Sequence, residues 1–301
     1  MNKIIAATED LQTIVNGLGY IWKKELGFIF HDKEKIKNVI IISYDSTYLY
    51  IFKHKNNPVG ILSEEKFATS LSDYYLLKKP HNIQLKRGDL LGWAAGFLLN
   101  DRFSQDKIIK FPNFNVPTLQ IISGPLITQF LSAQKEKSKT MPLNPYVTRE
   151  SYLATIVHEF GHAYFNNYHN WWYSNKNENV NFLQKALDLY KGSKNVEISQ
   201  ISFPNYDNRL TILGEIFAFC TDYSASLIFW KKHKEDIDQR NIIEISKLLP
   251  VESNKDLYRE NSVLDPDPGA HNAAMVFGKI LVEKFPYTWP EILINENRLK
   301  I

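Results

Sequence analysis

The sequence TRESYLATIVHEFGHAYF, residues 148–165, has apolar side chains at helical spacing around much of its circumference. The apolar positions are Tyr152, Leu153, Ile156, Val157, Phe160, Ala163 and Tyr164. Thr148 stands where an N-cap residue would accept a hydrogen bond from the free backbone N–H groups of the first turn. A helix that is apolar on most sides is buried on most sides, so this stretch predicts a central helix of the fold.

Residues 158–162 of this helix read His-Glu-Phe-Gly-His. Side chains four residues apart lie one helical turn above each other, so His158 and His162 can bind a single metal ion. Glu159 lies about 100° further round the helix, towards the open side of that ion. Imidazoles among apolar residues are costly to bury unless they are paired or coordinated. The motif therefore predicts one Zn²⁺ bound by the two histidines, with Glu159 as general base.

Gly161 lies inside the motif, where glycine costs about 1 kcal/mol relative to alanine. Close approach of another helix would explain a glycine at this position. We therefore expect a second helix to pack against residue 161.

A hydrolytic zinc site usually takes three protein ligands and leaves a fourth position for water. Glu215 is the main candidate for the third ligand, because it lies in LGEIFAF (213–219) on a second apolar helix, where a buried carboxylate needs a cation. A buried salt bridge or an exposed glutamate is the alternative. Asp222, seven residues later, is the rival ligand, although we prefer a solvated aspartate to an acceptor for an imidazole N–H. His169 is one residue too late for the metzincin spacing and is interpreted as a loop histidine.

At these residues the sequence resembles the gluzincin metallopeptidases, which include thermolysin-like enzymes and the aminopeptidase-N type. In those families a glutamate from a later helix completes an HExxH site, and the segment 215–218, Glu-Ile-Phe-Ala, looks like their Glu-Gly-Phe-Ala. The chain departs from the pattern in the long separation of His162 from Glu215 and in Gly214, where asparagine is common. The resemblance covers about residues 148–230 and implies a zinc metallopeptidase that cleaves a peptide or protein substrate.

Gluzincins also place a His or Tyr donor beside the developing oxyanion. His271, in Pro-Gly-Ala-His-Asn, is the candidate by resemblance, with a surface histidine at a helix start as the alternative. Tyr206 and Tyr223 are further candidates. By the same resemblance the strand predicted at 116–127 would align an extended substrate, whereas an ordinary sheet edge is the alternative. Two other functions stay open: hydrolysis of another amide or ester, and an inactive zincin-fold binding module.

The rest of the chain predicts an α+β, zincin-like fold. Residues 15–80 are strand-like and suggest a small antiparallel sheet, with strands in GFIFH, NVIIISY, STYLYIFKH and PVGILS. Prolines at both ends of 116–127 favour an edge strand, and 132–146 reads as a loop or boundary. Further helices are expected at 89–103, 178–191, 209–232, 240–249 and 271–285. We expect a sheet-bearing subdomain at 1–135 and a helical one at 146–301, which together form one catalytic unit.

Composition limits the remaining possibilities. The 301 residues include 44% hydrophobic residues, which is enough for a sizeable core. A formal charge of +3 is too small to argue for a nucleic-acid groove or a membrane surface, so we expect neither partner. The single cysteine excludes an intrachain disulfide and a multi-cysteine metal site. Since no signal peptide or transmembrane segment is visible, we expect a cytoplasmic protein. Oligomeric state and cleavage specificity are not predicted.

Overall fold

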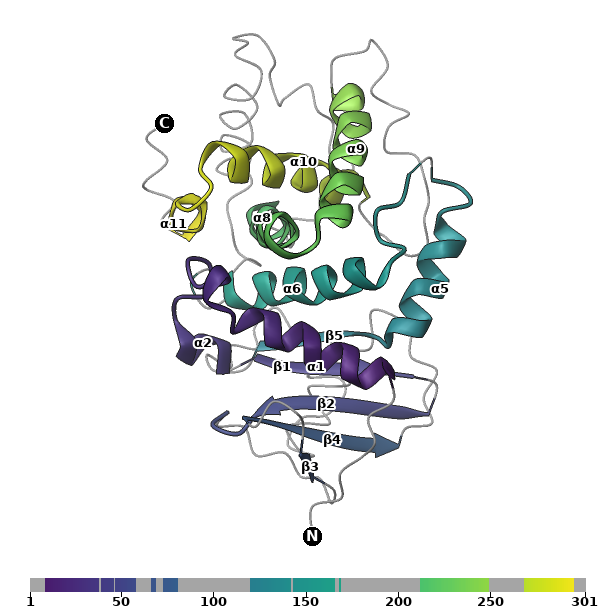
Figure 1. Cartoon of the computed structure of the whole chain (residues 1–301), viewed down its shortest axis with the longest axis vertical. Coiled ribbons are helices and arrows are strands. Elements are labelled where there is room, and N and C mark those ends of the chain that lie inside the picture. Colours follow the sequence, from purple (N-terminus) through teal and green to yellow (C-terminus); the bar gives the residue numbers. More distant parts are fainter. Residues whose placement is uncertain are drawn as a thin grey trace, which may run out of the picture.

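The computed structural model describes residues 9–37, 39–45, 47–57, 66–68, 73–80, 120–141, 143–165, 168, 212–248 and 268–294. Within this part of the chain the protein is α+β, as predicted. Figure 1 shows three helices, α6, α8 and α10, stacked above a sheet, with α1 in front of the boundary between them. None of the described helices is long and apolar enough to cross a membrane.

The sheet has five strands in the order β3-β4-β2-β1-β5. Their bounds are β1 Val39–Tyr44, β2 Tyr48–His54, β3 Lys66–Ala68, β4 Tyr74–Pro80 and β5 Gln120–Pro125. The first four strands pair antiparallel, as expected, whereas β5 pairs parallel to β1, with Ile41 opposite Ile122. Val39, Ile40, Ile41 and Ile42 are all buried, because β1 lies inside the sheet and is covered on both faces.

The helices are α1 Glu9–Ile21, α2 Lys33–Lys37, α5 Ile127–Lys137, α6 Arg149–Phe165, α8 Ile212–Phe229, α9 Lys231–Leu248, α10 Pro268–Lys284 and α11 Trp289–Ile294, with a 3₁₀ turn at Lys24–Leu26. Helix α6 matches the predicted central helix residue for residue after its cap. It contacts β5 and β1 on one side, α1 on another and α8 on a third. The predicted burial on most sides is therefore confirmed for α6.

Several element predictions were wrong. Residues 15–21 belong to α1, because Leu11, Ile14, Leu18 and Ile21 are buried at helical spacing. GFIFH forms turns and not a strand. The predicted loop 132–146 begins inside α5, which continues to Lys137.

The helix predicted at 209–232 ends at Phe229, and a separate helix, α9, starts at Lys231. Trp230 between them is 5% exposed, and its ring packs on Tyr20 of α1 at 4.8 Å between centroids. The chain therefore turns where a large aromatic ring is drawn into the core. Helix α10 begins at Pro268, three residues earlier than predicted, and proline is tolerated in a first turn.

The predictions of helices at 89–103 and 178–191 and of a strand in PVGILS lie outside the described residues. The two-subdomain division stays a prediction. Helix α1, from the predicted N-terminal subdomain, packs directly on α6. One hydrophobic cluster includes residues of the sheet, α1, α6, α8 and α10.

Glycines lie where the stacked helices cross. A Cβ atom on Gly17 of α1 would meet the side chain of Ile156 of α6 at 2.7 Å. A Cβ on Gly161 of α6 would lie 3.0 Å from the Cα of Ala218 of α8. The contact at Gly17 involves the end of a flexible side chain, whereas the contact at Gly161 involves backbone and is tighter than most real Cβ contacts, so α6 and α8 lie closer together at this position than alanine would allow without a shift. The predicted reason for Gly161 is therefore confirmed.

Both ends of α6 are held by hydrogen bonds. The N–H of Ser151 donates to Thr148 Oγ1 at 3.2 Å, and the N–H of Thr148 donates to Ser151 Oγ at 2.9 Å, which is a reciprocal cap. Towards the other end, the hydroxyl of Tyr164 accepts a hydrogen bond from the N–H of Asp32 at 3.1 Å. The helix that carries the HExxH motif is therefore fixed against the rest of the fold.

Candidate metal centre

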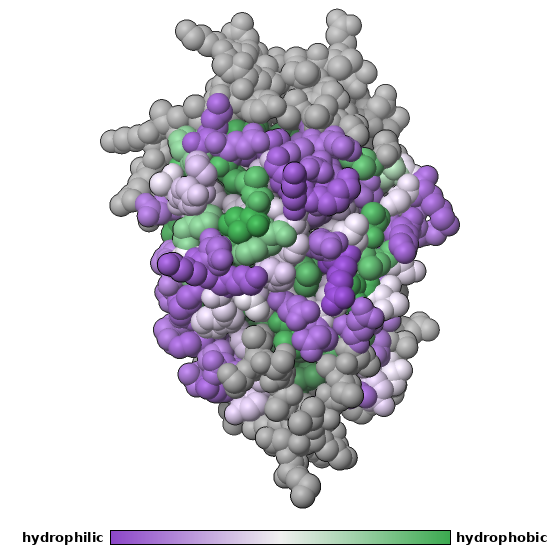
Figure 2. Space-filling view, in the orientation of Figure 1, coloured by the Kyte–Doolittle hydropathy of each residue, from purple (hydrophilic) through white to green (hydrophobic). Residues whose placement is uncertain are grey.

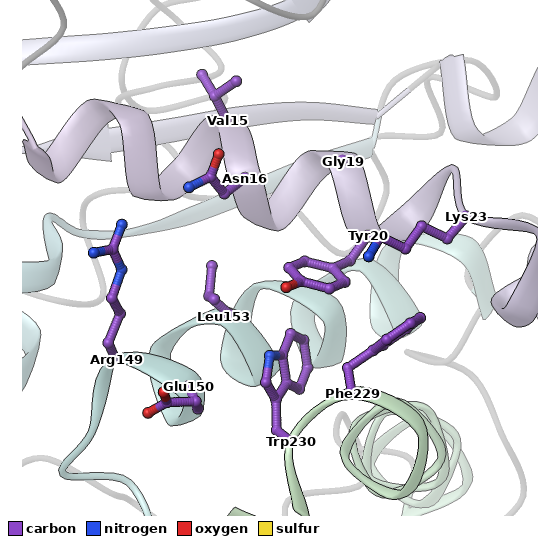
Figure 3. Close-up of a pocket in the computed structure, with 10 residues that line it drawn as sticks. All are labelled: Val15, Asn16, Gly19, Tyr20, Lys23, Arg149, Glu150, Leu153, Phe229 and Trp230. Carbon is purple, nitrogen blue, oxygen red and sulfur yellow. The ribbon is translucent and has the colours of Figure 1, made fainter.

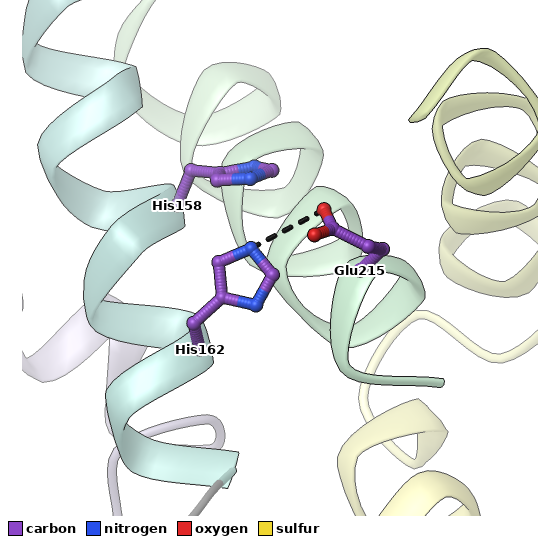
Figure 4. A group of neighbouring side chains, drawn as sticks. All are labelled: His158, His162 and Glu215. Atoms are coloured by element: carbon purple, nitrogen blue, oxygen red, sulfur yellow. Dashed lines mark ion pairs between the residues drawn. The ribbon is translucent and has the colours of Figure 1, made fainter. Parts of the chain in front are cut away.

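The side chains of His158, His162 and Glu215 converge between α6 and α8 (Figure 4). Each offers one ligand atom, and these atoms all lie within 4.8 Å of one another. His162 Nε2 is 3.3 Å from Glu215 Oε2. The two imidazole rings are 4.9 Å apart between centroids, with an interplanar angle of 77°. The structure therefore brings together the three residues that the sequence analysis named as ligands.

The three residues of the cluster differ in their exposure to solvent. His158 is 9% exposed and Glu215 is 8% exposed, whereas the side chain of His162 is 22% exposed. Glu159, the predicted base, is partly exposed on α6. Of the three ligand candidates, His162 is therefore the most accessible to solvent.

The donor set fits zinc. Two imidazole nitrogens and one carboxylate oxygen are the protein ligands of many catalytic zinc sites. Zinc binds each of these atoms at about 2.1 Å, so two ligands of a tetrahedral ion lie about 3.4 Å apart. The 3.3 Å separation of His162 Nε2 and Glu215 Oε2 is close to that value. The two side chains therefore need little movement to share an ion.

No protein-family model, curated protein or solved structure matches this chain at a significant level. Among the described residues, the cluster of His158, His162 and Glu215 is the group of three or more metal-binding side chains that the structure brings within reach of one ion.

Asp222 is not the solvated aspartate that the sequence analysis preferred. It is fully buried and accepts hydrogen bonds from Ser226 Oγ at 3.1 Å and from the Tyr146 hydroxyl at 3.4 Å. Its Oδ1 also lies 3.5 Å from His233 Nε2. Asp222 is absent from the convergent group, because its carboxylate faces α9 and the segment before α6 instead.

His233 and Tyr146 complete a buried polar cluster that sequence reasoning missed. His233 Nδ1 lies 3.0 Å from the carbonyl oxygen of Pro145, which can only accept, so Nδ1 carries a proton. Burial, followed by the nearby Asp222 carboxylate, raises the pKa of Tyr146 well above its ordinary value. No local pattern indicates this cluster, because His233 lies in the charged run KKHKED, which is typical of a solvated helix face.

Tyr223, another predicted site residue, bonds to side chains on two neighbouring helices. The hydroxyl of Tyr223 donates to Asp238 Oδ1 at 2.7 Å and accepts from Lys279 Nζ at 3.2 Å, so it is engaged with α9 and α10. Burial, together with Asp238, raises the pKa of Tyr223. The backbone of His271 is in the first turn of α10, and its side chain lies outside the described structure. His169 and Tyr206 also lie outside the described residues.

A groove of about 550 Å³ lies between α1, the first turns of α6 and the end of α8 (Figure 3). It is lined by the rings of Tyr20, Phe229 and Trp230 and by charged side chains that include Lys23 and Arg149. The ligand cluster does not line it. Figure 2 shows a mostly hydrophilic face with a smaller hydrophobic area near α8, and Leu227 and Ile228 at the end of that helix are 47% and 43% exposed.

Proposed function

We propose that this protein is a zinc-dependent metallopeptidase of the zincin group, with a gluzincin-like site. The observation that supports the proposal most is the convergence of His158, His162 and Glu215 from two different helices. A motif string alone can occur by chance, but an HExxH helix and a distant buried glutamate meet within ion-binding distance only if the fold places them together. The close α6–α8 contact at Gly161 supports the same arrangement.

When bound, zinc would supply a water of lowered pKa and polarise the substrate carbonyl. Glu159 would accept a proton from the attacking water and donate it to the leaving amine. The partial exposure of Glu159 agrees with this role, since a base must reach both water and substrate. His158 and Glu215, both buried, would hold their positions during turnover.

A peptide substrate is favoured by the position of β5. Within the described residues it is the last strand of the sheet, and it contacts α6. A strand at the edge of a sheet can offer backbone N–H and C=O groups to which an extended peptide hydrogen-bonds. The alternatives are a zinc hydrolase of another amide or ester and an inactive zincin-fold binding module, and no described contact favours either of them.

The test is the metal content of three purified proteins: the wild type, Glu215→Ala and Glu159→Gln. We expect one zinc per chain in the wild type and in Glu159→Gln, and less zinc after dialysis in Glu215→Ala. A mixed peptide library should be cleaved by the wild type and left intact by Glu159→Gln. Zinc binding without cleavage of any peptide would favour the alternatives, and a wild type without metal would disprove the proposal.

A further inference from the structure

The imidazole of His158 packs against an aromatic ring on the helix of the third ligand. The centroids of His158 and Phe219 are 4.5 Å apart, and their planes are inclined at 75°. This distance is at the short end of edge-to-face packing, so the two rings are in van der Waals contact. His162 lies on a further side of the same imidazole at 4.9 Å. His158 therefore cannot rotate freely about its Cβ–Cγ bond unless Phe219 moves.

Phe219 is itself fixed by α10. A Cβ atom on Gly278 would lie 2.9 Å from Phe219 Cβ, 3.0 Å from the backbone nitrogen of Cys220 and 3.1 Å from the carbonyl carbon of Phe219. These atoms belong to the backbone of α8 or are attached to it directly, so a side chain at 278 could not be accommodated by a rotamer change. Phe219 is 9% exposed, and α10 backs the helix on which it stands.

The contacts form a continuous series from Gly278 through Phe219 to His158. A metal ligand binds tightly when its ring is held in the orientation that the ion needs, because less conformational entropy is then lost on binding. An apolar wall also excludes water from one side of an ion and strengthens its electrostatic interactions. Each contact is buried, so both effects apply to His158.

We propose that Phe219 is a positioning residue for the metal centre, which holds the imidazole of His158 in its ligating orientation with α10 as support. This inference rests on the proposed zinc site, but it concerns how the ring of His158 is oriented and not which residues bind the ion. It predicts that zinc affinity depends on a side chain that cannot itself bind zinc.

The experiment compares Phe219→Leu with Phe217→Leu in the full chain. Phe217 is a matched control, since it is on the same helix, is fully buried and packs its ring on Phe165 and Trp289 at 5.1 and 5.0 Å. Both substitutions remove a buried ring from α8. Zinc affinity is measured by competition with a chelator, at a temperature where circular dichroism shows each zinc-free protein to be folded.

We expect Phe219→Leu to weaken zinc binding about 10-fold or more, the loss typical of removing support from a metal ligand. Phe217→Leu should change it less than about 3-fold, although both variants lower the melting temperature of the zinc-free protein. Cobalt substitution adds a spectroscopic test, because the visible bands of bound Co²⁺ depend on ligand geometry. The bands should change in Phe219→Leu and stay as in the wild type in Phe217→Leu.

Gly278→Ala provides a second test at a greater distance from the ion. Its added methyl should displace Phe219 and weaken zinc binding in the same direction as Phe219→Leu. If Phe219→Leu binds zinc with wild-type affinity and an unchanged cobalt spectrum, the positioning role is wrong, while the zinc site stands. Equal losses in Phe219→Leu and Phe217→Leu would also overturn it, since they would reflect general destabilisation. If the wild type binds neither ion, the proposed function fails first.

Discussion

Gly161 of α6 packs directly against Ala218 of α8, and these two helices carry the metal cluster. A Cβ on Gly161 would lie 3.0 Å from Ala218 Cα, and it would lie 2.9 Å from Thr221 Oγ1. Thr221 is fully buried, and its hydroxyl donates to the carbonyl of Phe217 at 2.8 Å. Neither neighbour can move aside easily. The absence of a side chain at residue 161 therefore sets how near Glu215 comes to the two histidines.

Gly161→Ala should lower both stability and zinc affinity. Overpacking lowers the free energy of unfolding by about 1–3 kcal/mol, whereas the higher helix propensity of alanine raises it by about 1 kcal/mol. We expect a net loss of up to about 2 kcal/mol in the free energy of unfolding of the zinc-free protein, measured with urea. Zinc retention should fall as well, because α8 carries Glu215 away from α6. A raised midpoint, as helix propensity alone would produce, would show that the two helices are not in close contact at this position.

Gly19→Ala is the matched control, and it should change the free energy of unfolding in the opposite direction. Gly19 is on α1, and a Cβ there would meet no other atom within 4 Å. Alanine should therefore raise the free energy of unfolding by about 0.5–1 kcal/mol through helix propensity alone. Urea denaturation of the two variants side by side separates the steric effect at Gly161 from the general effect of replacing a helical glycine. Destabilisation by Gly19→Ala would mean that this position is more crowded than the structure shows.

The sequence predicted α6 and its motif well because several independent signals agreed there. The cap at Thr148, the apolar spacing and the His-Glu-Phe-Gly-His string all specify the same helix. Glu215 could be named because a carboxylate in the apolar segment LGEIFAF requires a partner. In both cases the information is local, within one or two helical turns.

Other features could not be predicted because they depend on contacts distant in sequence. Asp222 looks the same in sequence whether it is solvated or buried, and Tyr146 and His233, which bury it, are contributed by other segments. The ring of Trp230, at the junction of α8 and α9, packs on Tyr20, which lies more than two hundred residues earlier in the sequence. The parallel pairing of β5 with β1 depends on the path of the chain between them and not on the composition of either strand.

Asp222→Ala should destabilise the protein and leave zinc binding intact. The substitution removes the acceptor of the Tyr146 and Ser226 hydroxyls and the carboxylate that faces His233. Loss of a buried acceptor with several donors costs about 2–4 kcal/mol in the free energy of unfolding. Asp222→Asn keeps one oxygen acceptor and should cost less. Urea denaturation and elemental analysis of the same preparations provide both quantities.

The two measurements also separate Asp222 from Glu215 as the third ligand. If Asp222 ligated the ion, Asp222→Ala would lose zinc and Glu215→Ala would keep it. The structure predicts the reverse, because Asp222 is absent from the convergent cluster. Zinc content should therefore follow residue 215, whereas the urea midpoint of the zinc-free protein should respond to residue 222.

Tyr74 should make the protein lose stability in alkali. Its ring is 3% exposed, and its hydroxyl accepts a hydrogen bond from Trp22 Nε1 at 3.1 Å. Burial raises the pKa of Tyr74 to about 12, although the Trp22 hydrogen bond opposes the shift. The folded state keeps this proton, whereas the unfolded chain loses it near pH 10. The contribution of protonated Tyr74 to the free energy of unfolding is therefore fully present below pH 10. It disappears between about pH 10 and pH 12, at about 1.4 kcal/mol per pH unit.

Tyr74→Phe isolates this contribution, since phenylalanine cannot ionise. At pH 9 the variant should lose the hydrogen bond from Trp22, which costs about 0.5–1.5 kcal/mol. Between pH 10 and pH 12 its free energy of unfolding should fall less steeply than that of the wild type. The two slopes should differ by up to about 1.4 kcal/mol per pH unit, the value for one proton. Other tyrosines with raised pKa values, such as Tyr152, keep part of the alkaline loss in both proteins. If the free energies of unfolding of the two proteins fall equally steeply with pH, Tyr74 ionises as readily in the folded state as in the unfolded chain.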